Sequence, residues 1–423
     1  MPRFSSLLAL GFLFPTLCRA QPAPTPTPAL SRQDVQKLAD RVLKETSAIR
    51  GLSVKRAVPT NVMSPQQIEK MMSGEIARPA AQNELNTSQI YLRQVGLVPK
   101  NYDLKAGYTR LLGEQVAGFY SSQTRSFTTS SRVAPLELET VMAHELTHAL
   151  QDQHFDLNRL DKWPKHESDS KLAFTSLVEG DATLVMSRYM TANPLRFFGV
   201  FVSSLGSLAR SDSAVLNESP RSLRESLLFP YRSGLTFVTR VQTGGGWNAV
   251  SAAFNRPPLS TQQILHPALY LENKTPQHVN VPDVRRALGS GWTLLDNDVN
   301  GEFGLSLLAG ENGDVPEASA AAENWAGDRY AIYSGPKGAV LVVQDSSWND
   351  AAGAKRWRAA YAHRTSLRFG SKAKEQKRGA LSAWNAAPDG VWLQQNGRRV
   401  VMLEGTVGAF NVERVLAALG MKN

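Results

Sequence analysis

The chain has 423 residues, of which 42% are hydrophobic and 20% charged, and its formal net charge is +10. This composition supplies enough apolar side chains for a core and excludes a wholly disordered, collagen-like or coiled-coil chain. The single cysteine excludes an intrachain disulfide framework and a cysteine-based zinc finger. No uninterrupted apolar run reaches the roughly 18 residues that span a bilayer, so we do not expect an integral membrane protein.

Residues 1–20 have the order of a secretory signal peptide. Arg3 supplies a positive charge, and residues 4–17 are mostly apolar. Cys18 and Ala20 are the small residues expected before a cleavage site. We therefore predict export, with cleavage near Ala20 and a periplasmic or secreted mature protein. Residues 21–30, QPAPTPTPAL, follow as a stiff proline-rich linker.

Residues 31–290 are predicted to form a mainly helical domain that contains a small β-sheet. Apolar residues at helical spacing, with Ser31 and Ser64 as caps, predict helices at about residues 31–50 and 64–75. A strand is expected at Val54–Val62. A β-hairpin is expected at residues 115–120 and 125–129. Long helices are expected from about residue 135 and at about residues 169–189, and mostly helical character is expected up to about residue 289.

Residues 291–423 are predicted to form a small α+β domain, so we assign the whole chain to the α+β class. Residues 311–322, ENGDVPEASAAA, are interpreted as a linker or exposed loop. The Asn396-Gly397 dipeptide is the strongest turn signal in the chain and predicts a hairpin over Val391–Leu403. A strand is also expected at residues 339–344, and helices are expected at residues 348–363 and 412–419.

This C-terminal region is basic and rich in tryptophan. Residues 351–400 contain 11 lysines and arginines against two acidic residues, Glu375 and Asp389, and six of the eight tryptophans lie after residue 290. Such a surface could make weak contact with an anionic polymer of the cell envelope. We favour a domain with tryptophan in its core and a solvated basic face, and we find no nucleic-acid-binding motif.

The strongest chemical signal lies at residues 141–154, VMAHELTHALQDQH, which contain the pattern HExxH. On a helix, His144 and His148 lie one turn apart on the same face and can present two imidazoles to one zinc ion. Glu145 points about 100° away, where it can reach a zinc-bound water as general base and later protonate the leaving amine. The pattern therefore predicts a zinc metallopeptidase.

A catalytic zinc site needs a third protein ligand, and two residues are candidates. His154 fits the spacing HExxHxxGxxH, but Gln151 replaces the glycine that would break the helix and return this histidine to the metal. Glu179 lies on the next predicted helix among apolar neighbours, where a carboxylate needs a partner. We favour Glu179, which would complete a His₂Glu zinc site with an open position for water.

These motifs resemble those of known zinc peptidases. HELTHAL followed by Asp152 is similar to the active helix of gluzincins, the thermolysin-like zincins whose third ligand is a glutamate on a following helix. The runs GFY, AHELTHALQDQHFDL, LVEGDA, FPYRSG and STQQILHP, within about residues 31–275, resemble more closely a group of poorly characterised exported bacterial metallopeptidases. The resemblance implies zinc at the two histidines and Glu179, with Glu145 as the catalytic acid/base. It also implies that an edge strand of the preceding hairpin holds the substrate backbone.

The chain departs from the thermolysin-like pattern at the residue that hydrogen-bonds a metal ligand. Those enzymes carry an aspartate four residues after the ligand glutamate, bonded to the first histidine, and here that position is Thr183. Asp169 or Asp181 could orient a ligand instead.

Gluzincins also use a histidine or tyrosine to stabilise the tetrahedral oxyanion, and Tyr231 and His266 are the candidates here. A packed aromatic with satisfied hydrogen bonds is the simpler interpretation of each. The sequence as a whole predicts an exported zinc-dependent endopeptidase that acts on a peptide or protein substrate. The alternative is a non-catalytic envelope-binding protein with a structural zinc and a basic C-terminal binding surface.

Overall fold

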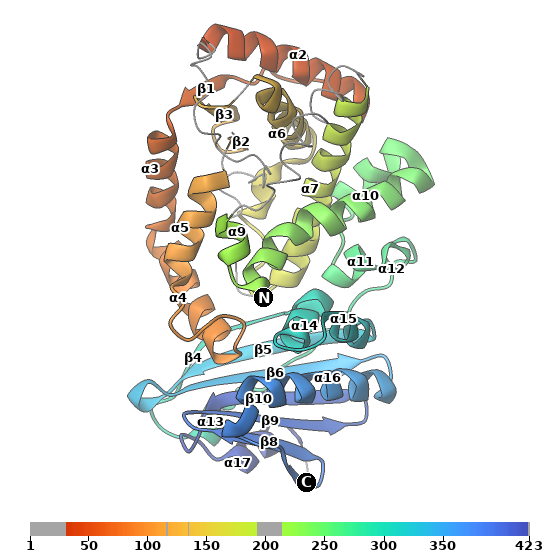
Figure 1. Cartoon of the computed structure of the whole chain (residues 1–423). Helices are drawn as coiled ribbons and strands as arrows, with labels where there is room; N and C mark the ends of the chain where they lie inside the picture. Colours follow the sequence, from red (N-terminus) through yellow and green to blue (C-terminus); the bar gives the residue numbers. More distant parts are fainter. Residues whose placement is uncertain (1–30, 116, 134, 193–213, 422–423) are drawn as a thin grey trace.

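The computed structural model describes residues 31–115, 117–133, 135–192 and 214–421. The predicted signal peptide and proline-rich linker lie outside the described residues. Helices with a three-stranded sheet form the first part of the chain, and a seven-stranded sheet with its helices forms the last part, which confirms the predicted α+β class (Figure 1). None of the helices in the described ranges is both long and apolar enough to cross a membrane.

The first two described helices begin where their serine caps predict. The Ser31 and Ser64 hydroxyls each accept a backbone N–H of the first turn, which satisfies one of the donors that a helix start leaves open. The helices they cap are α2 (Arg32–Arg50) and α3 (Pro65–Ile76). Two helices that the sequence pattern did not predict follow, α4 (Pro79–Gln94) and α5 (Leu104–Gln115).

Three short strands form a sheet in the order β1–β3–β2. The predicted hairpin is present, with β2 and β3 antiparallel, and β1 pairs parallel with β3, so β2 is an edge strand. The predicted strand at Val54–Val62 is wrong before Thr60, because the N–H groups of Lys55 and Arg56 bond the Gln153 side chain instead of a neighbouring strand. The strands are β1 (Thr60–Met63), β2 (Gly118–Ser121) and β3 (Ser126–Ser130).

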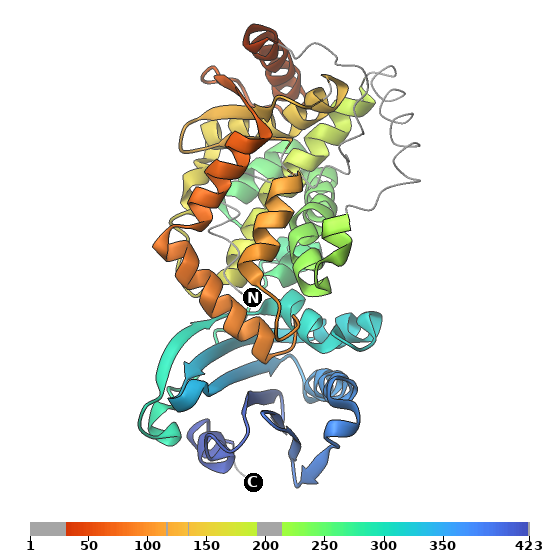
Figure 2. The same ribbon diagram turned by 60° about the vertical axis from the view of Figure 1, so that its left-hand side comes forward.

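Three long helices follow the hairpin and make up most of the helical part. Helix α7 packs against both α6 and α10, and in both views these helices stand on one side of the seven-stranded sheet (Figures 1 and 2). The long helices are α6 (Pro135–Phe155), α7 (Ser168–Thr191) and α10 (Arg221–Asn255). The shorter ones are η1 (Leu157–Leu160), α9 (Ala214–Glu218), α11 (Thr261–Leu265), α12 (Pro267–Leu271) and α13 (Arg285–Leu288).

Helices α7 and α10 cross at two glycines, Gly180 and Gly234. A Cβ atom at Gly180 would lie 2.2 Å from the backbone of Gly234, and a Cβ atom at Gly234 would lie 2.1 Å from the Ser176 carbonyl oxygen. Only residues without a side chain allow two helix backbones to approach this closely. The contact brings α10 next to Glu179, which immediately precedes Gly180.

The last part of the chain is built on an antiparallel sheet of order β4–β5–β6–β10–β9–β8–β7. The hairpin of β9 and β10 turns just after Asn396, as predicted. The strands are β4 (Thr293–Asp298), β5 (Trp325–Ser334), β6 (Val340–Trp348), β7 (Gln376–Arg378), β8 (Leu381–Ala386), β9 (Asp389–Asn396) and β10 (Arg399–Thr406). The helices are α14 (Gly301–Gly310), α15 (Val315–Ala322), η2 (Pro336–Gly338), α16 (Ala351–Phe369), η3 (Gly370–Lys372) and α17 (Val412–Ala418).

The interpretation of residues 311–322 as a linker or exposed loop is wrong, because helix α15 occupies most of this stretch. Asp314 caps the helix by accepting the backbone N–H of Glu317, and Pro316 lies in the first turn, where a proline is tolerated. Ala318 and Ala321 are buried on the packed face. The proline and small residues that suggested a loop instead suit a helix start and a close helix contact.

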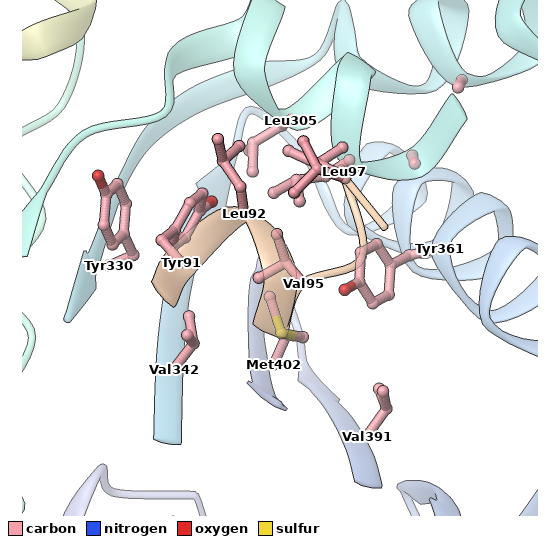
Figure 3. Close-up of a cluster of buried hydrophobic side chains, with 14 of the residues drawn as sticks. Tyr91, Leu92, Val95, Leu97, Leu305, Tyr330, Val342, Tyr361, Val391 and Met402 are labelled. Atoms are coloured by element: carbon pink, nitrogen blue, oxygen red, sulfur yellow. The ribbon is translucent and has the colours of Figure 1, made fainter. Parts of the chain in front are cut away.

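Residues on both sides of the predicted boundary at 290 contribute to one hydrophobic core (Figure 3). The α4 side chains Tyr91 and Leu92 pack among residues of the seven-stranded sheet, and the rings of Tyr91 and Tyr330 stack with their centroids 4.5 Å apart. The predicted core role of the tryptophans is confirmed, since four of them are fully buried: Trp325, Trp348, Trp357 and Trp384.

The glycine crossing can be tested with two alanine substitutions in the same helix. We expect Gly234→Ala to lower the free energy of unfolding by about 1–3 kcal/mol or more, because its Cβ would meet the α7 backbone. Gly244→Ala is the matched control, because a Cβ there would meet nothing within 4 Å. Thermal or urea unfolding measures both. Equal stability of the two variants would contradict a tight crossing.

Candidate metal centre

Three side chains from α6 and α7 converge at one point. His144 Nε2 lies 3.0 Å from His148 Nε2 and 3.1 Å from Glu179 Oε2, and His148 Nε2 lies 3.6 Å from the same oxygen. All three donor atoms lie within 4.8 Å of one another, and all three residues are buried. Two imidazole nitrogens and one carboxylate oxygen at this spacing could hold one metal ion.

Burial controls the protonation of these three groups. Removal from water lowers the pKa of His144 and of His148 to about 4, so both imidazoles are neutral at pH 7 and present lone pairs. Burial also raises the pKa of Glu179, because a negative charge is unfavourable beside the apolar Leu177 and Val178. A bound divalent cation would favour the ionised carboxylate, so the donor set fits a metal ion.

Glu145 lies beside this cluster without being one of its three donors. Its Oε2 accepts the backbone N–H of Tyr120 in β2 at 2.8 Å. Its Oε1 is buried and finds no hydrogen-bond partner among the described residues. Burial raises the Glu145 pKa well above its ordinary value, and the nearby Glu179 raises it further. Glu145 is thus a buried carboxyl group with one oxygen bonded to the edge strand and the other able to bond a further group.

Tyr231 of α10 also lies at the cluster. Its ring centroid is 6.1 Å from that of His144, and its hydroxyl hydrogen-bonds Glu179. Burial raises the Tyr231 pKa well above its ordinary value, and the carboxyls of Glu179 and Glu145 raise it further, so the phenol keeps its proton. Tyr231 and Gly234 share a face of α10, three residues apart, and the glycine crossing therefore brings the phenol to this point.

Sequence reasoning missed the role of Gln151. Its Oε1 lies 2.8 Å from His148 Nδ1, and its Nε2 donates to Asp181 Oδ2 at 2.9 Å. The side chain therefore connects a candidate metal ligand to a buried aspartate. The signal that could have revealed it is its position one turn after His148, since residues three apart share a helix face.

His154 lies away from the cluster, as expected for an unbroken helix. Helix α6 continues to Phe155, and the half-buried His154 has its Nε2 2.8 Å from the Ser53 carbonyl oxygen. This placement agrees with Glu179 as the third donor.

The two aspartates predicted to orient a ligand lie in different places. Asp181 contacts Gln151 and through it His148. Asp169, in the first turn of α7, accepts both the backbone N–H and the hydroxyl of Thr261 in α11. It precedes Glu179 by ten residues, or about 15 Å along the helix axis. Asp169 therefore anchors α11 to the start of α7 and does not reach the ligands.

His266, the other predicted oxyanion residue, is paired elsewhere. It follows α11, and its Nε2 lies 2.7 Å from Glu302 Oε1 of α14. The hydrogen bond to Glu302 raises the His266 pKa. Since α11 meets α7 near Asp169, the position of His266 does not support a role at the metal centre.

The identity of the third ligand can be tested by metal content. We expect Glu179→Ala to lose the bound metal, because two neutral imidazoles alone would hold it weakly. His154→Ala should keep about one metal ion per chain, since its side chain contacts the Ser53 carbonyl oxygen and the Phe155 ring and lies away from the cluster. Metal analysis of the purified variants measures both. Metal loss in the His154 variant alone would overturn the assignment.

The buried Asp169 predicts a pH-dependent stability. Burial raises its folded-state pKa to about 8 from an ordinary 3.8. Between these values the folded protein keeps a proton that the unfolded chain releases, so stability falls as the pH rises from 4 to 8. Relative to Asp169→Asn, the wild type should lose up to about 1.4 kcal/mol per pH unit in this window. Urea unfolding at several pH values tests this, and a gap that does not change with pH would contradict it.

Residues 292–416 match the family model of a domain of unknown function, DUF8575, a segment that contains none of the metal-centre residues. Comparison with curated proteins gives no match. The chain is similar to a solved structure from Chloroflexus aurantiacus, described as "a putative hydrolase with a novel fold", at 16% identity and a TM-score of 0.39, with 60% of this chain and 94% of that chain covered.

Proposed function

We propose that this chain is an exported zinc-dependent endopeptidase that hydrolyses peptide bonds in a peptide or protein substrate. The observation that carries the proposal is the buried carboxyl of Glu145 next to a His144, His148 and Glu179 cluster. A site that only held a metal for structure would need its ligands alone. An additional carboxyl with one free oxygen suits a group that moves a proton.

The donor set supports zinc as the metal. Two histidines and one glutamate form a known catalytic zinc arrangement, in which three protein ligands leave one position open. When bound, zinc would supply Lewis acidity that polarises the substrate carbonyl and lowers the pKa of water. Neutral imidazoles at pH 7 agree with this assignment, because only the neutral ring can donate a lone pair.

Glu145 would act as general base and then as general acid. Its raised pKa makes the ionised carboxylate a stronger base than an ordinary glutamate, so it can take a proton from the attacking water and transfer that proton to the leaving amine nitrogen. Its Oε2 is held by the Tyr120 N–H, so its Oε1 is the oxygen available for proton transfer. Tyr231, protonated and adjacent, would donate a hydrogen bond to the developing oxyanion.

Strand β2 is suited to bind the substrate backbone. It lies at the edge of its sheet, and its Tyr120 N–H already contacts Glu145. An extended peptide paired with this edge would pass beside the metal cluster, because main-chain hydrogen bonds hold an added strand alongside its neighbour.

One observation favours the alternative, an envelope-binding protein with a structural metal. His144, His148, Glu179 and Glu145 are all fully buried, and a closed site suits a structural ion. Function would then rest on the basic C-terminal region and its contact with anionic envelope polymers. The peptidase proposal requires that the site open to admit a substrate.

The Glu145→Gln variant separates these two functions. For a peptidase it should abolish cleavage of a labelled unfolded protein while keeping about one zinc per chain, because the amide cannot accept the proton and Glu145 is not a ligand. Glu137→Gln, in the first turn of the same helix, is the matched control and should retain activity. The peptidase proposal fails if the zinc-loaded wild type cleaves the labelled protein no faster than Glu145→Gln does.

A further inference from the structure

Arg50 is a fully buried arginine at the end of α2, far from the HExxH motif in sequence. Its Nε donates to Asp181 Oδ1 at 2.7 Å, and both side chains are 0% exposed. Its Nη1 donates to Ser251 Oγ at 3.1 Å, and its guanidinium lies 4.7 Å from the centre of the Trp247 ring. A buried charge needs such compensation, and here α7 and α10 together hold the guanidinium in one place.

The other oxygen of Asp181 determines the orientation of the Gln151 amide. Gln151 Nε2 donates to Asp181 Oδ2 at 2.9 Å and to the Val178 carbonyl oxygen at 3.0 Å. A flipped amide would place its oxygen against two acceptors, which is unfavourable. Gln151 Oε1 must therefore face His148, where it lies 2.8 Å from Nδ1.

This orientation selects one tautomer of His148. A carbonyl oxygen can only accept, so His148 Nδ1 must carry the proton, and Nε2 is left with its lone pair. Nε2 is the atom that faces His144 and Glu179. The helical spacing of the two histidines alone would leave both tautomers and several ring rotations open, because the last torsion of a histidine side chain is broad.

We propose that Arg50 and Asp181, acting through Gln151, are positioning residues that hold His148 in the tautomer and orientation that bind the metal. The inference rests on the proposed metal site and extends it to a residue of helix α2. We call this chain of hydrogen bonds the relay: it connects the Arg50 cation to the Asp181 carboxylate, the carboxylate to the Gln151 amide, and the amide to the His148 imidazole. Since Arg50 does not touch the metal cluster in the described structure, its effect must appear in metal affinity without loss of a ligand.

Removal of the ion pair as a unit tests the relay. We expect Arg50→Met/Asp181→Leu to weaken zinc binding about 10- to 100-fold, the usual effect of losing a partner behind a metal ligand. Replacement of both charges by apolar residues avoids leaving one buried charge unpaired. Competition with a chromophoric zinc chelator measures the dissociation constant, and the visible spectrum of the Co²⁺-loaded protein reports on the ligand geometry.

A second buried ion pair in the same chain provides the matched control. Arg364 and Glu404 in the C-terminal part are 0% and 1% exposed and 3.2 Å apart, as deeply buried as the Arg50 pair. Glu404 also pairs with Arg368 at 2.6 Å, so removing this pair disturbs the fold at least as much as removing the Arg50 pair. Arg364→Met/Glu404→Leu should leave zinc affinity within about twofold of the wild type, because the pair has no hydrogen bond to α6 or α7 among the described residues. Equal loss in both double variants would show a general effect of destabilisation and would overturn the proposal.

Two further variants keep the test decisive if the double variant fails to fold. Gln151→Leu cuts the relay while leaving the ion pair intact, and it should weaken zinc binding to a similar degree. Arg50→Lys keeps a positive charge beside Asp181 but gives up the guanidinium contacts to Ser251 and Trp247, so it should weaken zinc binding less than Arg50→Met/Asp181→Leu does. Unchanged affinity in folded Gln151→Leu would overturn the positioning role alone. A wild type that binds no zinc would instead remove the metal site on which the proposed function depends.

Discussion

The burial of Glu179 between two histidines is the constraint on which the rest of this structure depends. A carboxylate in an apolar pocket costs free energy unless a cation or hydrogen bonds compensate it. Here the compensation available within the described residues comes from neutral imidazoles and the Tyr231 phenol, none of which carries a positive charge. A divalent cation at this point would favour the ionised carboxylate, and the surrounding helices hold the three donor side chains together.

Several elements distant in sequence cooperate to hold this pocket. The glycine contact between Gly180 and Gly234 lets α10 approach α7 and brings Tyr231 to the cluster. The edge strand β2 fixes one oxygen of Glu145 through a backbone N–H. Helix α2 supplies Arg50, whose ion pair with Asp181 orients the amide behind His148. Each contact is between backbone groups or buried side chains, which allow little displacement.

The elements that were predicted correctly carry local signals. The serine caps mark the starts of α2 and α3, and the Asn396-Gly397 pair marks the turn between β9 and β10. Helix α4 escaped prediction because its sequence is largely polar, and its buried residues are stabilised by the seven-stranded sheet, a tertiary effect. Helix α15 was predicted as a linker or loop because a proline suits both a loop and the first turn of a helix. Only the packing of the buried alanines distinguishes the two.

The sequence by itself determined the pair of histidines and the glutamate between them, because a helix of known period places residues four apart on one face. It also favoured Glu179, since an apolar setting makes a carboxylate conspicuous. Tertiary structure alone decided that Tyr231 and not His266 meets the cluster, that Asp181 and not Asp169 bonds the amide next to His148, and that Arg50 pairs with this aspartate. These contacts join residues up to 131 positions apart in the sequence. The periodicity of one helix does not encode which other helix will pack against it.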